Sequence, residues 1–198
     1  MASAIPKPGL ISPAEYLAME RMAEFKSEYF QGEVFAMSGG TTCHSLISTN
    51  ITRELGNLLK GRDCTVYNSD LRVKVPAAGL YTYPDGIVVC GRPETEDART
   101  DTLLNPLVLI EVLSPGSESY DRGRKFNFYR QIASLRTYLL VAQETPRVEQ
   151  FVRQENAQWL LSEAEGLASQ LHLPALAVDL RLAEVFADVT FEPISLHR

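Results

Sequence analysis

Two carboxylate residues lie where two apolar strands are expected to begin and end. Asp85 opens the run 83–89, and Glu111 follows the run 107–110, 26 residues after Asp85. Continuous apolar runs are typical of strands covered on both faces. If the two strands are neighbours, the carboxylates converge, and paired carboxylates are hard oxygen ligands suited to Mg²⁺ or Mn²⁺. The alternative is that Asp85 caps a turn and Glu111 reaches solvent at a strand end.

A lysine on the helix that follows the second strand is the candidate cation of this site. The sequence predicts a helix over 118–133, and the stripe of it that is expected to be buried consists of Phe126, Tyr129 and Ala133. Lys125 lies beside that stripe, so it can lean toward the sheet. There it could stabilise charge on a phosphate or orient the attacking water. The alternative is a surface ion pair between Asp121 and Lys125, worth about 0.3–0.5 kcal/mol.

Three arginines of the same helix form a candidate phosphate-contacting patch, and these are Arg122, Arg124 and Arg130. A solvated helix face is the alternative. The chain has 19 Lys and Arg against 25 Asp and Glu, a net charge of −6, so it lacks the overall basic field that most nucleic-acid binders use for steering. A nucleic-acid role would therefore depend on a local patch.

The other elements are predicted from capping residues and hydrophobic periodicity. Ser12 caps a helix that runs to about Phe25, and apolar residues at three- and four-residue spacing give the longest helix, over 41–60. Two short strands within 28–37 flank a Gln-Gly turn, and the polar stretch 91–106 is expected to be a loop. Further strands are predicted at 65–67, 71–75, 83–90, 107–110, 138–142, 148–151 and around Trp159, and a short helix at 182–186.

The composition favours one ordinary compact domain. With 198 residues, 45% of them hydrophobic, we expect a single α/β or α+β domain over 1–198, with helices flanking a mixed sheet. A membrane-spanning stretch and a secretory signal are both missing from the sequence, which favours a cytoplasmic protein with no membrane role. The three cysteines, Cys43, Cys64 and Cys90, are odd in number and widely spaced, so they are expected to be reduced core residues.

The order of these residues resembles the Uma-type restriction endonuclease family of bacteria, within the PD-(D/E)XK nuclease superfamily. The resemblance covers nearly the whole chain. It is carried by Tyr-Pro-Asp at 83–85, Leu-Ile-Glu-Val-Leu-Ser-Pro at 109–115, Asp121 with Lys125 and Tyr129, Glu-Tyr-Phe-Gln-Gly-Glu-Val at 28–34, Met37-Ser38, His44, Tyr-Leu-Leu-Val at 138–141 and the stretch 173–186.

The resemblance implies a restriction-endonuclease-like core and a DNA endonuclease that depends on Mg²⁺ or Mn²⁺. In that comparison Asp85 and Glu111 hold the metal, and the Val112 carbonyl is a candidate further ligand. The superfamily has a lysine two residues after the second acid, where this chain has Leu113. The family shares this feature, and the substitute is Lys125. Weaker candidates for the site are Glu28, Glu33 and His44.

Two other functions use the same residues. A non-catalytic module, either a nucleic-acid binder or a dimerising scaffold, would keep the fold without turnover, and the acidic net charge and Leu113 favour it. A hydrolase of a small phosphorylated metabolite would need the same acids but no DNA channel. A homodimer would let two sites cut two strands and would give the hairpin at 148–159 a partner.

Overall fold

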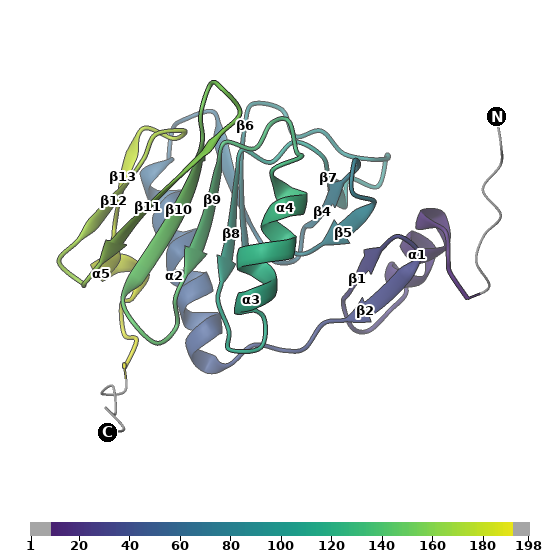
Figure 1. Ribbon diagram of the computed structural model, residues 1–198, viewed down its shortest axis with the longest axis horizontal. Helices are drawn as coiled ribbons and strands as arrows, with labels where there is room; N and C mark the ends of the chain where they lie inside the picture. Colours follow the sequence, from purple (N-terminus) through teal and green to yellow (C-terminus); the bar gives the residue numbers. More distant parts are fainter. Residues whose placement is uncertain (1–8, 192–198) are drawn as a thin grey trace.

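The computed structural model describes residues 9–191 and has a mixed α+β architecture built around a six-stranded sheet (Figure 1). The strands of this sheet are β3 (Cys64–Asn68), β6 (Gly86–Cys90), β8 (Val108–Val112), β9 (Thr137–Val141), β10 (Arg147–Arg153) and β11 (Trp159–Glu165). Their order is β11-β10-β9-β8-β6-β3. The expected fold class is confirmed. None of the helices within 9–191 has the length and apolarity that a bilayer crossing requires.

The central strands are buried on both faces, which explains their continuous apolar sequences. The helix α2 (Thr42–Leu58) packs on one face, against alternate residues that include Val88, Ile110 and Leu139. The intervening residues on the opposite face include Ile87, Leu109 and Tyr138. That face is covered by α3 (Glu118–Tyr120), the π-helical turn η1 (Asp121–Lys125) and α4 (Phe126–Tyr129). Figure 1 shows α2 behind the sheet and α3 and α4 in front of it.

A second sheet, of five strands, includes the two strands that come first in the sequence. It has the order β2-β1-β5-β4-β7, and its strands are β1 (Ser27–Phe30), β2 (Glu33–Ala36), β4 (Arg72–Val75), β5 (Leu80–Thr82) and β7 (Thr102–Leu103). The hairpin of β1 and β2 confirms the two strands predicted around the Gln-Gly turn. The strand β5 was not predicted, and β7 lies within the predicted loop. Both are too short to carry a period, and β7 is held by its parallel pairing with β4 and by a bridge from Leu103 to Thr95.

The first helix, α1 (Pro13–Glu20), is shorter than the sequence predicts. Ser12 caps it with the expected capping box, but the helix ends at Glu20 instead of continuing to Phe25. Met22 and Phe25 are 89% and 80% exposed, so a further turn would have no core to pack against. The long helix α2 agrees with the prediction to within two residues at either end.

The helix predicted over 118–133 is divided by the π-helical turn and ends at Tyr129. Ala133, expected in the buried stripe, is exposed, and Ile132 is buried instead. Because the helix ends at Tyr129, Ala133 lies outside it and does not continue the stripe. The sequence period alone reveals neither this end nor the π-helical turn before Phe126.

The cysteine prediction is wrong for two of the three residues. Cys64 and Cys90 form a disulfide across the antiparallel pair β3 and β6, in which they are direct register partners. They are 26 residues apart in sequence, so only the strand pairing brings them together. Cys43 is a free thiol.

The C-terminal part forms a small hairpin that packs beside α2. It consists of β12 (Gln170–Leu173), β13 (Val178–Arg181) and α5 (Leu182–Val185). The short helix was predicted and the two strands were not. Leu171, Leu173 and Leu180 of this hairpin belong to the same core as α2.

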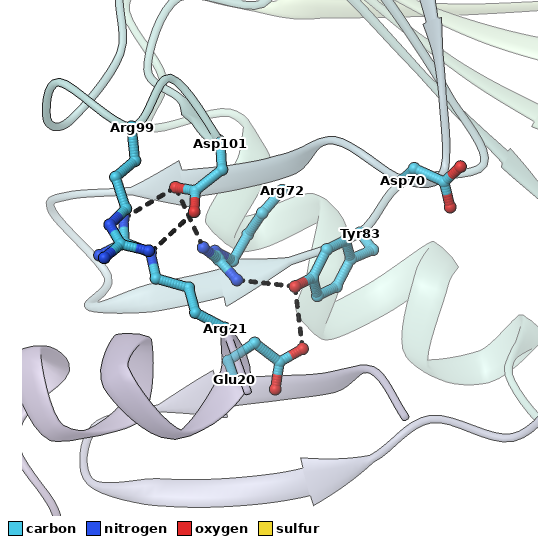
Figure 2. A pocket seen from close by; sticks show the side chains of 7 residues that line it. All are labelled: Glu20, Arg21, Asp70, Arg72, Tyr83, Arg99 and Asp101. Atoms are coloured by element: carbon cyan, nitrogen blue, oxygen red, sulfur yellow. Dashed lines mark hydrogen bonds and ion pairs between the residues drawn. The ribbon is translucent and has the colours of Figure 1, made fainter. Parts of the chain in front are cut away.

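A cluster of polar side chains connects the end of α1 to the second sheet. Figure 2 shows the side chains of this cluster. Arg21 donates from Nε and Nη2 to the carboxylate of Asp101, at 2.7 and 2.9 Å. The buried Arg72 donates to the Tyr83 hydroxyl at 2.7 Å, and that hydroxyl donates to Oε1 of Glu20 at 2.8 Å. Tyr83 lies three residues before Gly86, the first residue of β6, so the cluster connects the end of α1 to the beginning of a central strand.

Replacing Asp101 with Asn should destabilise the fold at neutral pH by about 0.5–1 kcal/mol, a small value because the side chain is 35% exposed. The hydrogen bond from Arg21 lowers the pKa of Asp101 from 3.8 to about 2. A lowered pKa means that the stabilisation is complete above 3.8 and is lost as the pH falls through about 2. Urea unfolding of both proteins across this range should therefore show the difference vanishing in acid. An equal difference at every pH would contradict the prediction.

Candidate active site

Asp85 and Glu111 lie side by side because β6 and β8 are antiparallel neighbours. Gly86 pairs with Ile110, so the next pair outward in the same register is Asp85 and Glu111. Side chains alternate along a strand, and both acids therefore belong to the sheet face that η1 covers. Oδ2 of Asp85 accepts the backbone N–H of Val112 at 2.8 Å, which fixes that carboxylate across the strand gap. The prediction that the two strands are neighbours is confirmed.

Glu111 is buried, with 4% of its surface exposed, so the alternative in which it reaches solvent is wrong. Two groups bind the same oxygen, Oε1. The Tyr129 hydroxyl donates to it at 2.7 Å, and Nζ of Lys125 is 2.8 Å away. The carboxylate is therefore held in a fixed orientation by one neutral and one charged donor.

Lys125 is 5% exposed, so the surface ion pair considered for it is also wrong. Its ammonium is surrounded by acids. Besides Glu111, Oδ1 of Asp121 lies 3.5 Å from Nζ and Oε1 of Glu28 lies 3.6 Å from it. Glu28 comes from β1 and also accepts a hydrogen bond from the Thr82 hydroxyl. The second sheet thus contributes an acid to the site on the central sheet.

The cluster carries more acid than its one lysine offsets. Burial raises the pKa of Glu111 well above its usual value, and the nearby charges of Asp121 and Asp85 raise it further, against the attraction of Lys125. Burial also raises the pKa of Asp121. For Lys125, burial opposes the charged form, but the attraction of Glu111, Glu28 and Asp121 outweighs it, and its pKa lies well above its usual value. Lys125 is therefore charged, and the carboxylates around it repel one another.

His44 joins the cluster from the first turn of α2. Thr41 caps the helix and accepts the backbone N–H of His44 at 3.1 Å. Nε2 of His44 is 3.3 Å from Oδ2 of Asp85, and this hydrogen bond raises the pKa of His44 in opposition to burial. A Cβ at Gly40 would lie 2.9 Å from Nδ1 of His44, so the absence of a side chain there leaves room for the imidazole.

A cavity of about 330 Å³ opens onto these groups. The candidate residues that line it are Glu28, His44, Asp85, Glu111, Val112, Asp121 and Lys125. Glu33, an exposed residue of β2, is not among the residues that line it. Of the three weaker candidates, two therefore reach the cavity and one lies outside it.

The three arginines do not form one surface. Arg122 donates to Glu118 at 2.8 Å and to Glu149 at 2.9 Å, so its charge is already paired. Arg124 is exposed and stacks over the ring of Phe30, with Cζ 4.7 Å from the ring centre. Arg130 is exposed at the end of α4. Arg124 borders a cavity next to this one, and neither Arg122 nor Arg130 lines either of the two.

Asp121, which the sequence analysis named in the family resemblance and as a surface partner of Lys125 but not as a site candidate, also belongs to this cluster. It is 2% exposed and lines the cavity. The spacing of Asp121, Lys125 and Tyr129 carried the signal, because residues four apart lie on one face of a helix. An acid, a lysine and a buried tyrosine on one face indicate a polar group directed into the protein.

Comparisons with known proteins are consistent with this geometry. A family model, Uma2, described as "Putative restriction endonuclease", matches residues 13–184. Two uncharacterized proteins of Synechocystis sp. are similar: one is 33% identical over 181 residues, covering 91% of this chain and 94% of its own, and the other is 32% identical over 169 residues, covering 85% and 96%. A crystal structure from Anabaena variabilis, described as a putative nuclease belonging to DUF820, has a TM-score of 0.72 at 18% identity and covers 89% of this chain and 97% of that one. This structural likeness establishes a shared fold.

Proposed function

The chain belongs to the Uma2 family, described as "Putative restriction endonuclease", and from this premise we propose that it is a divalent-metal-dependent endonuclease that hydrolyses phosphodiester bonds in DNA. The observation that carries the proposal is the meeting of Asp85, Glu111 and Lys125 in one cavity. Two acids and a lysine, drawn from two neighbouring strands and a helix, are the groups that metal-assisted phosphodiester hydrolysis requires.

The acids fit a divalent cation. The hydrogen bonds described above engage Oδ2 of Asp85 and Oε1 of Glu111, and the second oxygen of each carboxylate makes no hydrogen bond within residues 9–191. Nowhere in that range do three His, Cys, Asp or Glu side chains form a ready-made metal cage. The ligands would therefore be the two carboxylates, the Val112 carbonyl and water, a mixture typical of Mg²⁺. A bound cation would also offset the repulsion among the acids.

The cation would supply Lewis acidity and a more acidic water. The protein's own groups would do the rest. Nζ of Lys125 would stabilise negative charge that develops on the phosphate, and the low water content around a 5% exposed lysine would strengthen that effect. Nε2 of His44 would hold Asp85 in place, and the Tyr129 hydroxyl would do the same for Glu111.

Removing divalent ions should abolish cleavage. We expect the wild-type protein to nick supercoiled plasmid in Mg²⁺ or Mn²⁺ at low salt and to leave it intact in EDTA, because the acids alone repel a phosphate. The same ions should raise the Tm, since a ligand that binds only the folded state stabilises it. Cleavage that continues undiminished in EDTA would contradict the metal dependence. Reactions without protein, in the same nuclease-free buffers, serve as controls.

A non-catalytic nucleic-acid-binding or dimerising module is the second candidate. Leu113, at the position where the superfamily has its lysine, is 4% exposed and belongs to the core, which favours this alternative. For such a module, Mg²⁺ and Mn²⁺ should neither raise the Tm nor lead to cleavage of DNA. The melting and plasmid-nicking experiments described above therefore distinguish the two candidates.

A homodimer built on the β10–β11 hairpin forms part of the proposal. The strand β11 is at the edge of the central sheet, and its Leu160 and Leu161 are 58% and 53% exposed. Exposed apolar residues on a free edge are suited to pairing with a second copy. Light scattering of the wild type and of a Leu161→Lys variant would test this.

A further inference from the structure

A second cavity, of about 310 Å³, lies beside the active-site cavity. It is lined by Glu28, Phe30, Phe35, Leu80, Tyr120 and Arg124. Three of these residues, Glu28, Phe35 and Tyr120, also line the active-site cavity, so the two spaces share a wall. Its volume is near the lower end of the range for ligand pockets, about 300–1,000 Å³.

Two of its aromatic rings line the cavity without stacking on another ring of the described chain. Phe30 packs on Phe128, with ring centres 4.9 Å apart. Phe35 on β2 and Tyr120 on α3 make no ring-to-ring contact with another aromatic residue of the described chain, although both line the same cavity. The side chain of Phe35 is 48% exposed, which is a large fraction for an aromatic residue. Free aromatic faces that border a cavity can receive a flat ring between or against them.

Polar groups also line this cavity. The guanidinium of Arg124 supplies planar donors, and the carboxylate of Glu28 supplies an acceptor. Burial raises the pKa of Tyr120 to about 12, so its hydroxyl stays protonated and can donate. Aromatic faces with donors and an acceptor around the rim match a nucleobase, which has two apolar faces and a polar perimeter.

We propose that Phe35 and Tyr120 form a subsite for one unstacked nucleobase next to the bond that is cut. The proposal rests on the proposed function and names its substrate class: a strand with an unpaired base, either single-stranded DNA or a duplex from which one base is rotated out. A cavity of about 310 Å³ has room for a flat base, and a base inside a duplex has both faces covered by its neighbours, so it must leave the stack to reach these rings. Arg124 lies where it can contact the edge of the base or the adjoining phosphate.

The test uses the fluorescent nucleoside 2-aminopurine deoxyriboside and the whole protein in EDTA. The probe is uncharged and carries no phosphate, so its binding does not require a metal. Stacking should quench its fluorescence in a saturable way. Phe35→Ala and Tyr120→Ala should each weaken binding roughly 5- to 140-fold, the range expected for loss of one base–aromatic stack. Tyr120→Phe and Phe35→Trp keep a ring and should retain binding.

Leu167→Ala is the matched control, because Leu167 is 48% exposed, as Phe35 is, and lines neither cavity. Melting curves of all variants establish that they fold. Absence of quenching by the wild type, or equal quenching by the wild type, Phe35→Ala and Tyr120→Ala, would overturn the subsite. If the variants with a ring quench and those without it do not, but plasmid is never cut, the subsite is supported and the proposed function is overturned. If plasmid is cut but no protein quenches the probe, the proposed function is supported and the subsite is overturned.

Discussion

Glu111→Gln is expected to lose metal-dependent plasmid cleavage by roughly 10²- to 10³-fold, the effect of removing one preorganised electrostatic group from an active site. The change keeps the shape of the side chain and its acceptor for the Tyr129 hydroxyl. It removes a negative charge that a divalent ion would need. The rise of Tm in Mg²⁺ or Mn²⁺ should disappear together with cleavage, which separates loss of metal binding from a slower chemical step.

The fold should tolerate this change. Lys125 keeps two carboxylates, Asp121 at 3.5 Å and Glu28 at 3.6 Å, so its charge is not left alone in the core. Glu54→Gln is the matched control, because Glu54 is a buried glutamate of α2 that does not line the active-site cavity. It should cut plasmid like the wild type. Full cleavage by a folded Glu111→Gln protein would refute the proposed mechanism.

The position of each acid at a strand end was predictable, because the sequence of a strand indicates both how buried the strand is and where it begins and ends. The runs around Ile87 and Leu109 are apolar without alternation, which indicates strands in the interior of a sheet. A charged residue at the end of such a run must have a partner or a ligand. The sequence left open whether the two strands are neighbours, and the structure supplies that pairing, which brings Asp85 and Glu111 together in the next register pair.

The surroundings of the acids were less predictable because they depend on contacts between distant segments. Glu28 reaches Lys125 only after β1 joins β5 and the second sheet docks against η1. The π-helical turn that contains Asp121 and Lys125 has no hydrophobic period of its own. The disulfide between Cys64 and Cys90 depends on strand register. Local sequence patterns report none of these long-range pairings.

Lys125→Met is expected to lower both activity and stability. Without its ammonium the cavity keeps Glu28, Glu111 and Asp121 with no counter-charge, and removing one partner of a buried ion cluster typically costs about 3–5 kcal/mol. Cleavage should fall by roughly 10²- to 10³-fold because charge on the phosphate loses its stabilising group. Urea unfolding and plasmid nicking measure the two effects separately.

The pH dependence and the response to metal distinguish this explanation from simple misfolding. Burial already raises the pKa of Glu111, and a raised carboxylate pKa means that stability is present at low pH and is lost as the pH rises. The stability deficit of Lys125→Met should therefore shrink from neutral to mildly acidic pH, as the acids take up protons. Mg²⁺ should also raise the Tm of the variant more than that of the wild type, because the cation replaces the missing charge. Lys74→Met, which removes a partly buried lysine paired with Glu96 outside the cavity, should keep plasmid nicking and gain no more Tm from Mg²⁺ than the wild type does. A Lys125→Met protein that is as stable and as active as the wild type at neutral pH would show that the ammonium has no part in the site.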